Sequence, residues 1–126
     1  MSAPVVKNVS KIFREYEGYH SFGEWFDAEN NLYIGRNASK YANRDIPESK
    51  WSNPYKSGNC AGGSLEDVLE KYEIYVRNNP FLMNSLHELR DKQLGCWCKP
   101  KPCHADVLLK LYNEICGDRA SVIKTL

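Results

Sequence analysis

Three features that would place the chain in a membrane, secretory or nucleic-acid-binding class are missing from its sequence. No apolar run approaches the roughly 18 residues that a membrane helix needs. Residues 1–4 lack the basic segment and apolar core that open a secretory signal. Net charge is +1, from 17 Lys and Arg against 16 Asp and Glu, so charge does not indicate nucleic acid as a partner. We expect no membrane partner.

Cysteine is present in an odd number, five, and no secretory signal precedes it. Disulfides persist mainly in secreted proteins, whereas cytosolic thiols are kept reduced. We therefore expect reduced thiols and a cytoplasmic location, and a disulfide framework is the weaker interpretation. In particular, we expect no bridge from Cys98 to either Cys96 or Cys103.

The pattern of strands and helices predicts a single α/β domain over residues 1–126. Short β-branched or apolar segments predict three strands, at residues 4–9, 32–34 and 93–98. Apolar residues at helical spacing predict three helices, which span about residues 65–78, 80–89 and 103–116. The order β-β-loop-α-α-β-α favours a small sandwich, with a short central sheet flanked by helices.

Capping residues mark the ends of the expected helices. Ser64 is a good N-cap for the first helix, and Asp67 holds the capping-box position. Asn79 suits the cap of the second helix, because Pro80 is favoured in a first turn. Gly117 suits the end of the last helix.

Two aromatic-containing stretches have no clear periodicity. Residues 13–33 hold seven of the fifteen aromatic residues. They form either an irregular lobe over one edge of the core or a platform that stacks on a base or sugar. Residues 37–63 form a long loop, and Trp51 and Tyr55 indicate that it is ordered. Lys50, Trp51 and Asn53 could face a ligand there. In the alternative, the turn is purely structural and the Trp51 side chain fills a space in the core.

The densest group of reactive side chains follows the third expected strand and consists of Cys96, Cys98, Cys103 and His104. In α/β sheets, ligands bind beyond the carboxyl ends of strands and close to helix N-termini. Arg36 follows the second expected strand, where it could clamp a phosphate or a carboxylate. These residues make the strand ends the candidate site.

The candidate site sets two geometric expectations. The loop over residues 37–63 should approach the Cys-His cluster, with Trp51 or Asn53 near His104. Trp97 should lie on the face of the sheet opposite Cys96 and Cys98, because successive strand residues alternate.

Three chemical interpretations of the cluster stay open. In the first, three thiolates and one imidazole bind Zn²⁺: Cys96, Cys98, Cys103 and His104. In the second, a thiolate of Cys98 or Cys103 is a nucleophile. His104 is then its base, and Asp106 orients the imidazole. In the third the cysteines only pack, because a cysteine thiol behaves as a small apolar group.

Three segments resemble the signature of one family of small domains: residues 33–36 read Y-I-G-R, 49–55 read S-K-W-S-N-P-Y and 94–104 read L-G-C-W-C-K-P-K-P-C-H. The family is catalogued as a domain of unknown function and occurs in phages, bacteria, large DNA viruses and microbial eukaryotes. Its pattern runs Y-I-G-R, S-K-W-G-N-P-F and L-G-C-W-C-x-P-x-x-C-H-G-D-V-L. This chain departs from it at Ser52, Tyr55 and Ala105. The resemblance covers about residues 32–112 and implies an aromatic-rich N-terminal insertion; for a viral member, the location is the host cytoplasm.

Two classes of function fit these observations, and they leave open whether the protein is an enzyme. The first binds or processes a nucleotide or nucleotide-derived small molecule between the strand ends and the loop over residues 50–55. The second is a zinc-stabilised, non-catalytic module that binds protein or nucleic acid. A cavity joining Arg36, Trp51 and His104 would favour the first, and a closed metal site under a flat surface the second.

Overall fold

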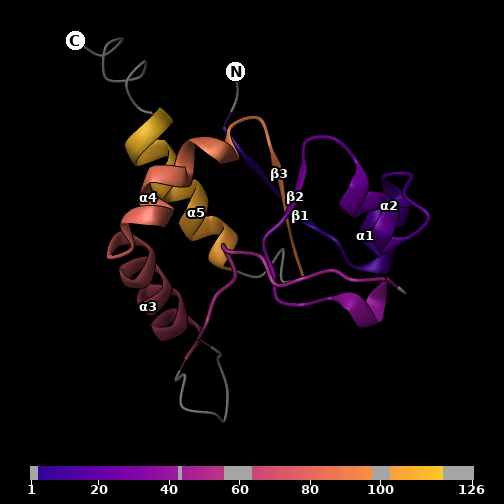
Figure 1. Ribbon diagram of the computed structural model, residues 1–126, viewed down its shortest axis with the longest axis horizontal. Coiled ribbons are helices and arrows are strands. Elements are labelled where there is room, and N and C mark those ends of the chain that lie inside the picture. Colours follow the sequence, from indigo (N-terminus) through magenta and orange to yellow (C-terminus); the bar gives the residue numbers. More distant parts are fainter. Residues whose placement is uncertain (1–2, 43, 56–63, 98–102, 118–126) are drawn as a thin grey trace.

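The protein is built around a sheet of three parallel strands (Figure 1). The computed structural model describes residues 3–42, 44–55, 64–97 and 103–117. Strand β3 (Gln93–Cys96) lies in the centre, between β1 (Val5–Asn8) and β2 (Asn31–Tyr33). The three expected strands are confirmed at these positions. The third is shorter than expected, because the backbone bends at Trp97.

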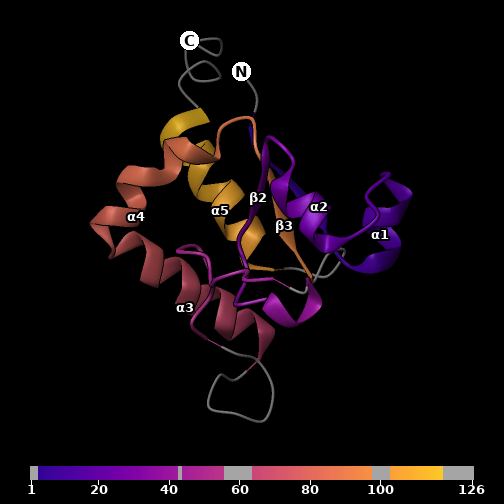
Figure 2. The same cartoon turned by 45° about the vertical axis from the view of Figure 1, so that its right-hand side comes forward.

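Helices lie on both sides of the sheet, as Figure 1 and Figure 2 show. On one side are α1 (Lys11–Tyr16) and α2 (Phe22–Asp27). On the other are α3 (Leu65–Arg77), α4 (Pro80–Ser85) and α5 (His104–Tyr112). Short 3₁₀ helices, which are wound more tightly than an α-helix, occur at Ser39–Tyr41 and Leu86–Leu89. A wider π-helical turn occurs at Asn113–Gly117. The fold is therefore of the mixed α/β class, as the sequence predicts. None of the helices described has the length and apolar character needed to cross a membrane.

The sheet separates two apolar cores. Leu94 and Cys96 belong to the core shared with α3, α4 and α5. Trp97 packs against the second core, which includes Phe22 and Trp25 of α2. Because successive strand residues face opposite sides, Trp97 lies opposite Cys96, which confirms that expectation. Cys98 is outside the described residues.

The two predicted N-caps are confirmed by hydrogen bonds, whereas α5 ends at Tyr112 and Gly117 belongs to the wider turn that follows it. Ser64 Oγ accepts the Asp67 N–H at 3.1 Å, which caps α3. Asn79 Oδ1 accepts the Leu82 N–H at 3.2 Å, which caps α4 ahead of its first residue, Pro80. These bonds satisfy N–H groups that a helix start leaves without a partner.

The aromatic N-terminal stretch forms a packed lobe that contains two short helices. Phe22 and Trp25 of α2 are fully buried. The Phe22 ring meets the rings of Tyr33 and Trp97 edge-on, each at a centroid distance of 5.2 Å. The interpretation as a lobe over the core thus holds for this helix, although the lobe is more regular than expected. The Phe22 and Trp25 rings are already covered by protein and cannot serve as an exposed stacking platform.

Gly95 in the central strand allows the close approach of α2, and its replacement tests this packing. A Cβ at Gly95 would overlap the Trp25 ring and lie 2.7 Å from Val9 Cγ1. We expect Gly95→Ala to lower the free energy of unfolding by about 1–3 kcal/mol, as overpacked cores do. Urea denaturation measures the change.

The matched control is Gly23→Ala in α2. There a new Cβ would have ordinary contacts, the nearest at 3.6 Å from Arg44 Cδ. Its stability should match or exceed that of the wild type, because alanine favours a helix over glycine. Equal stability of the two variants would contradict the packing argument.

Candidate functional site

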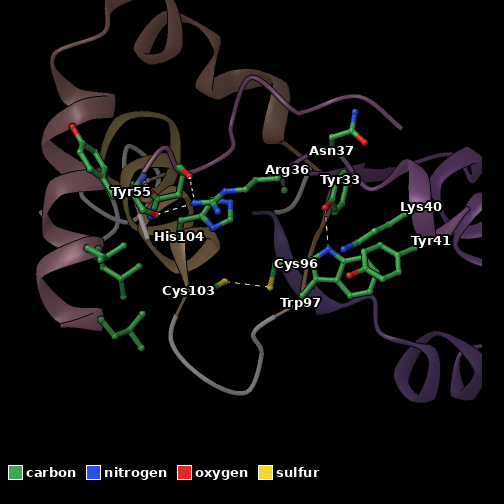
Figure 3. Close-up of a pocket in the computed structure, with 15 residues that line it drawn as sticks. Tyr33, Arg36, Asn37, Lys40, Tyr41, Tyr55, Cys96, Trp97, Cys103 and His104 are labelled. Atoms are coloured by element: carbon green, nitrogen blue, oxygen red, sulfur yellow. Dashed lines mark hydrogen bonds between the residues drawn. The ribbon is translucent and has the colours of Figure 1, made fainter. Parts of the chain in front are cut away.

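An open cavity of about 600 Å³ lies beside the carboxyl ends of β2 and β3 and the start of α5 (Figure 3). Its wall contains four aromatic rings, those of Tyr33, Tyr41, Tyr55 and Trp97. Two thiols, Cys96 and Cys103, and the imidazole of His104 also line it. A volume of this size is in the range of small-molecule sites.

The cavity carries positive charge that nearby carboxylates do not neutralise. Arg36 and Lys40 line it, and among the described residues no Asp or Glu does. Elsewhere, ion pairs neutralise some cations of the described surface, whereas Lys11 and Lys71 have no ion pair within the described part of the chain; the paired ones are Lys7, Arg44, Lys50, Arg77 and Lys110. The cavity therefore favours an anionic ligand.

Arg36 holds the loop that forms one side of the cavity. Its Nη2 donates to the carbonyl oxygens of Asn53 at 3.0 Å and Tyr55 at 3.1 Å. Asn53 Oδ1 in turn accepts the Tyr55 N–H at 2.8 Å, which stabilises the turn. One guanidinium nitrogen is thus used for structure, and among the described residues no group accepts from the other two nitrogens of Arg36.

The two cavity thiols lie together where β3 ends and α5 begins. Cys103 Sγ is 3.2 Å from Cys96 Sγ, and Figure 3 shows the pair beneath His104. Cys103 is the N-cap of α5, and its sulfur accepts the Ala105 N–H at 3.3 Å. Asp106 completes the cap, because its Oδ2 accepts the Cys103 N–H at 3.0 Å. Donors at a helix start favour the thiolate form of an N-cap cysteine, whereas burial, which leaves Cys103 2% exposed, favours the neutral thiol.

His104 is held in one orientation by the backbone of the neighbouring strand end. Its Nε2 lies 2.7 Å from the Ile34 carbonyl oxygen. A carbonyl only accepts, so Nε2 carries a proton, and in the neutral ring Nδ1 is the acceptor. Burial lowers the pKa of His104 and outweighs the opposite effect of the bond to Ile34, while the charge of Arg36 lowers it further. The neutral imidazole can therefore accept a proton or bind a metal at Nδ1.

Tyr72 of α3 connects the loop to His104 through the core. Its hydroxyl donates to the Trp51 carbonyl oxygen at 2.6 Å. Its ring meets the His104 ring edge-on, with centroids 5.2 Å apart. The described part of the loop over residues 37–63 thus approaches the cluster, and Asn53 and His104 line the same cavity. This confirms the expectation that Trp51 or Asn53 lies near His104.

The structure gathers five of the candidate site residues around the cavity: Arg36, Asn53, Cys96, Cys103 and His104. Trp51 does not line the cavity; its side chain is 1% exposed and packs in the core. Lys50 lies outside the cavity as well and forms an ion pair with Glu88 at 2.7 Å. Asp106 caps α5 and is not part of the lining. Cys98 falls outside the described residues.

Residues that the sequence did not mark as ligand-binding also line the cavity: Tyr33, Lys40, Tyr41, Tyr55 and Trp97. Trp97 directly follows Cys96, and Tyr33 precedes Arg36 by three positions, so proximity to the motifs was a usable signal. Lys40 and Tyr41 lie in a short helical turn of the loop, in a stretch without periodicity. Nothing in their local pattern distinguishes them from surface residues.

The family model described as "Domain of unknown function (DUF4326)" matches residues 19–114. This match begins within the aromatic lobe and includes every described residue that lines the cavity. A curated protein of Enterobacteria phage T4, an "uncharacterized 12.4 kDa protein in nrdA-td intergenic region", is 34% identical over 68 residues. The alignment covers 48% of this chain and 63% of that relative's length. No solved structure matches the chain.

The buried His104 predicts a loss of stability in mild acid. Its pKa lies below the ordinary 6.5 in the folded state, so the unfolded chain takes up the proton first as pH falls. Stability should therefore fall as pH drops from about 6.5 toward the lower folded-state value. We expect urea midpoints at about pH 7.5 and pH 5 to differ more for the wild type than for His104→Gln.

His20→Gln is the matched control, because His20 is exposed and lies outside the cavity. It should retain the pH dependence of the wild type. A His104→Gln variant with an unaltered pH dependence would show that this imidazole is not held neutral by burial.

Proposed function

We propose that this protein, which belongs to the family of domains of unknown function DUF4326, binds a nucleotide or a nucleotide-derived small molecule in the cavity at the strand ends. The observation that carries the proposal is the combination of unneutralised cations and aromatic rings in one cavity. Arg36 and Lys40 supply the charge, and no described carboxylate lines the same space. A phosphate group satisfies such cations.

The aromatic wall supports a ligand that also has a flat ring. Tyr41 is 57% exposed, and its ring lies 5.2 Å from that of Trp97. Lys40 Nζ lies 5.0 Å from the centroid of the Tyr41 ring, so charge and ring surface occur together. Aromatic side chains stack on any base, and the amides of Asn37 and Asn53 add hydrogen-bonding groups to the lining.

The groups at the inner end of the cavity could also process the ligand. The neutral His104 offers Nδ1 as a proton acceptor, and Cys103 lies next to it at the N-terminus of α5. A base and a thiol in one cavity fit general base or nucleophilic catalysis. This proposal keeps the expectation of a cytoplasmic protein with reduced thiols, because a nucleophilic thiolate requires the reduced form.

A zinc-stabilised interaction module is the second candidate, and it is favoured by the pair of sulfurs 3.2 Å apart. Metal-binding imidazoles commonly donate their second N–H to a backbone carbonyl, as His104 does to Ile34. Its candidate ligands are Cys96, Cys103, His104 and Cys98, which lies outside the described residues; within the described part of the chain no three Cys, His, Asp or Glu side chains are arranged to hold a metal ion. These donors suit Zn²⁺.

Nucleotide binding is tested by isothermal titration with ADP. We expect the wild type to bind ADP and Lys40→Ala to weaken binding about fivefold, the effect of losing one exposed charge contact. Added salt should also weaken binding, because it screens exposed charges.

Lys11→Ala is the matched control, because Lys11 is an exposed lysine of α1 outside the cavity. Its ADP affinity should equal that of the wild type. A wild-type protein that binds neither ADP nor pyrophosphate at millimolar concentration would contradict the proposal, as would equal effects of the two lysine variants.

The zinc alternative is tested by elemental analysis together with Cys103→Ser. Serine is itself a preferred N-cap, so this variant keeps the cap of α5. If Zn²⁺ is bound, the variant should lose both metal and thermal stability, because a structural zinc site contributes folding free energy. Cys116→Ser is the control, since Cys116 lies outside the cavity.

A metal-free wild type would exclude the zinc module. The thiolate interpretation then predicts that Cys103→Ser folds normally and that the native Cys103 is alkylated rapidly at neutral pH. Slow alkylation in a metal-free protein would leave packing as the role of the thiol pair.

A further inference from the structure

The hydroxyl of Tyr33 is a hydrogen-bond donor whose proton is not used within the described part of the chain. Tyr33 ends β2 and is 5% exposed. Its oxygen accepts the Trp97 Nε1–H at 2.9 Å. An indole nitrogen only donates, so the phenol is the acceptor in this bond and keeps its own proton for another partner. Among the described residues none accepts that proton.

The Tyr33 ring is fixed in place by its neighbours. It lies across the α-carbon of Gly35, where a Cβ would come within 2.6 Å of Tyr33 Cζ. Phe22 closes the other side, with its ring edge-on at 5.2 Å. A side chain at residue 35 would displace the phenol, so the glycine of the Y-I-G-R segment has a steric role.

The hydroxyl shares the cavity with both unneutralised cations. Tyr33, Arg36 and Lys40 all line it, and Figure 3 shows the Tyr33 oxygen joined to Trp97 on the side of the cavity where Lys40 and Tyr41 lie. Burial raises the pKa of Tyr33 and outweighs the opposite effect of the Trp97 hydrogen bond. The phenol therefore remains protonated, and it lines the same cavity as cations that attract an oxyanion.

We infer that the Tyr33 hydroxyl donates a hydrogen bond to a phosphate oxygen of the ligand, and that Trp97 and Gly35 are positioning residues for this hydroxyl. The inference rests on the proposed function, because it assigns one contact within the same cavity. The hydrogen bond from Tyr33 orients the phosphate, whereas the charge of Lys40 attracts it. A donor held rigidly before binding loses little conformational freedom when the ligand arrives.

The experiment compares three probes by isothermal titration: ADP, inorganic pyrophosphate and adenosine. Tyr33→Phe keeps the ring and removes the hydroxyl, so it should weaken ADP and pyrophosphate about tenfold, as expected for a hydrogen bond to a charged group. Adenosine lacks phosphate, and its affinity should not change. Gly35→Ala keeps the hydroxyl but displaces it, so it should reproduce the loss.

Tyr16→Phe is the matched control, because Tyr16 is 92% exposed on α1 and lies outside the cavity. It should bind all three probes like the wild type. Urea denaturation checks that each variant is folded. If Gly35→Ala fails to fold, Tyr33→Phe alone decides the result.

The outcomes separate this inference from the proposed function. If the wild type binds ADP and pyrophosphate and Tyr33→Phe binds them equally well, the inference is wrong and the proposed function stands. An equal loss for adenosine would assign Tyr33 to packing and would also overturn the inference. If pyrophosphate binds and is weakened by Tyr33→Phe while ADP does not bind, the inference stands and the nucleotide class is wrong. No binding of any probe overturns both.

Discussion

The hydrogen bond from His104 Nε2 to the Ile34 carbonyl joins the start of the last helix to the end of strand β2. These residues are far apart in the chain, and their contact places Cys103 beside Cys96 and α5 beside Arg36. The same bond fixes the imidazole tautomer, which leaves Nδ1 as the acceptor. The position and the tautomer of the imidazole thus depend on this one contact, whereas burial keeps the ring neutral.

The charges of the cavity differ from those of the ion-paired surface. Arg36 and Lys40 line one concave site, and no described carboxylate lines it with them. The pairing of Arg77 with both Glu73 and Glu114 shows that this chain can neutralise cations where structure alone matters. The overall charge of +1 therefore does not reveal that the cavity itself is positively charged. Such a charge is understandable if an anion occupies the cavity during function.

Sequence patterns predicted the three strands and the helices from α3 to α5, because capping residues and apolar periodicity act locally, but they missed α1 and α2 in the aromatic stretch. Ser64 and Asn79 cap the helices as expected, and β3 begins at Gln93 as predicted. The site was predicted less completely. From the sequence, Trp51 could equally contact a ligand or pack in the core. Which side of its loop is buried depends on packing against Tyr72, a residue distant in sequence. Lys40 and Tyr41 reach the cavity through the course of an irregular loop, which no periodic pattern specifies.

The two candidate chemistries compete for one lone pair. With Nε2 committed to Ile34, a neutral His104 has a single acceptor, Nδ1. If Nδ1 binds Zn²⁺, the imidazole cannot also serve as a base, and a thiolate bound to the ion is a weakened nucleophile. A metal-loaded protein would therefore keep the cationic and aromatic part of the cavity as a binding site without this catalytic pair. Ligand binding through Arg36, Lys40 and Tyr33 is compatible with either state, because none of these residues belongs to the candidate zinc ligands. Binding is thus the more robust part of the proposed function, and catalysis depends on the thiols and imidazole remaining free of metal.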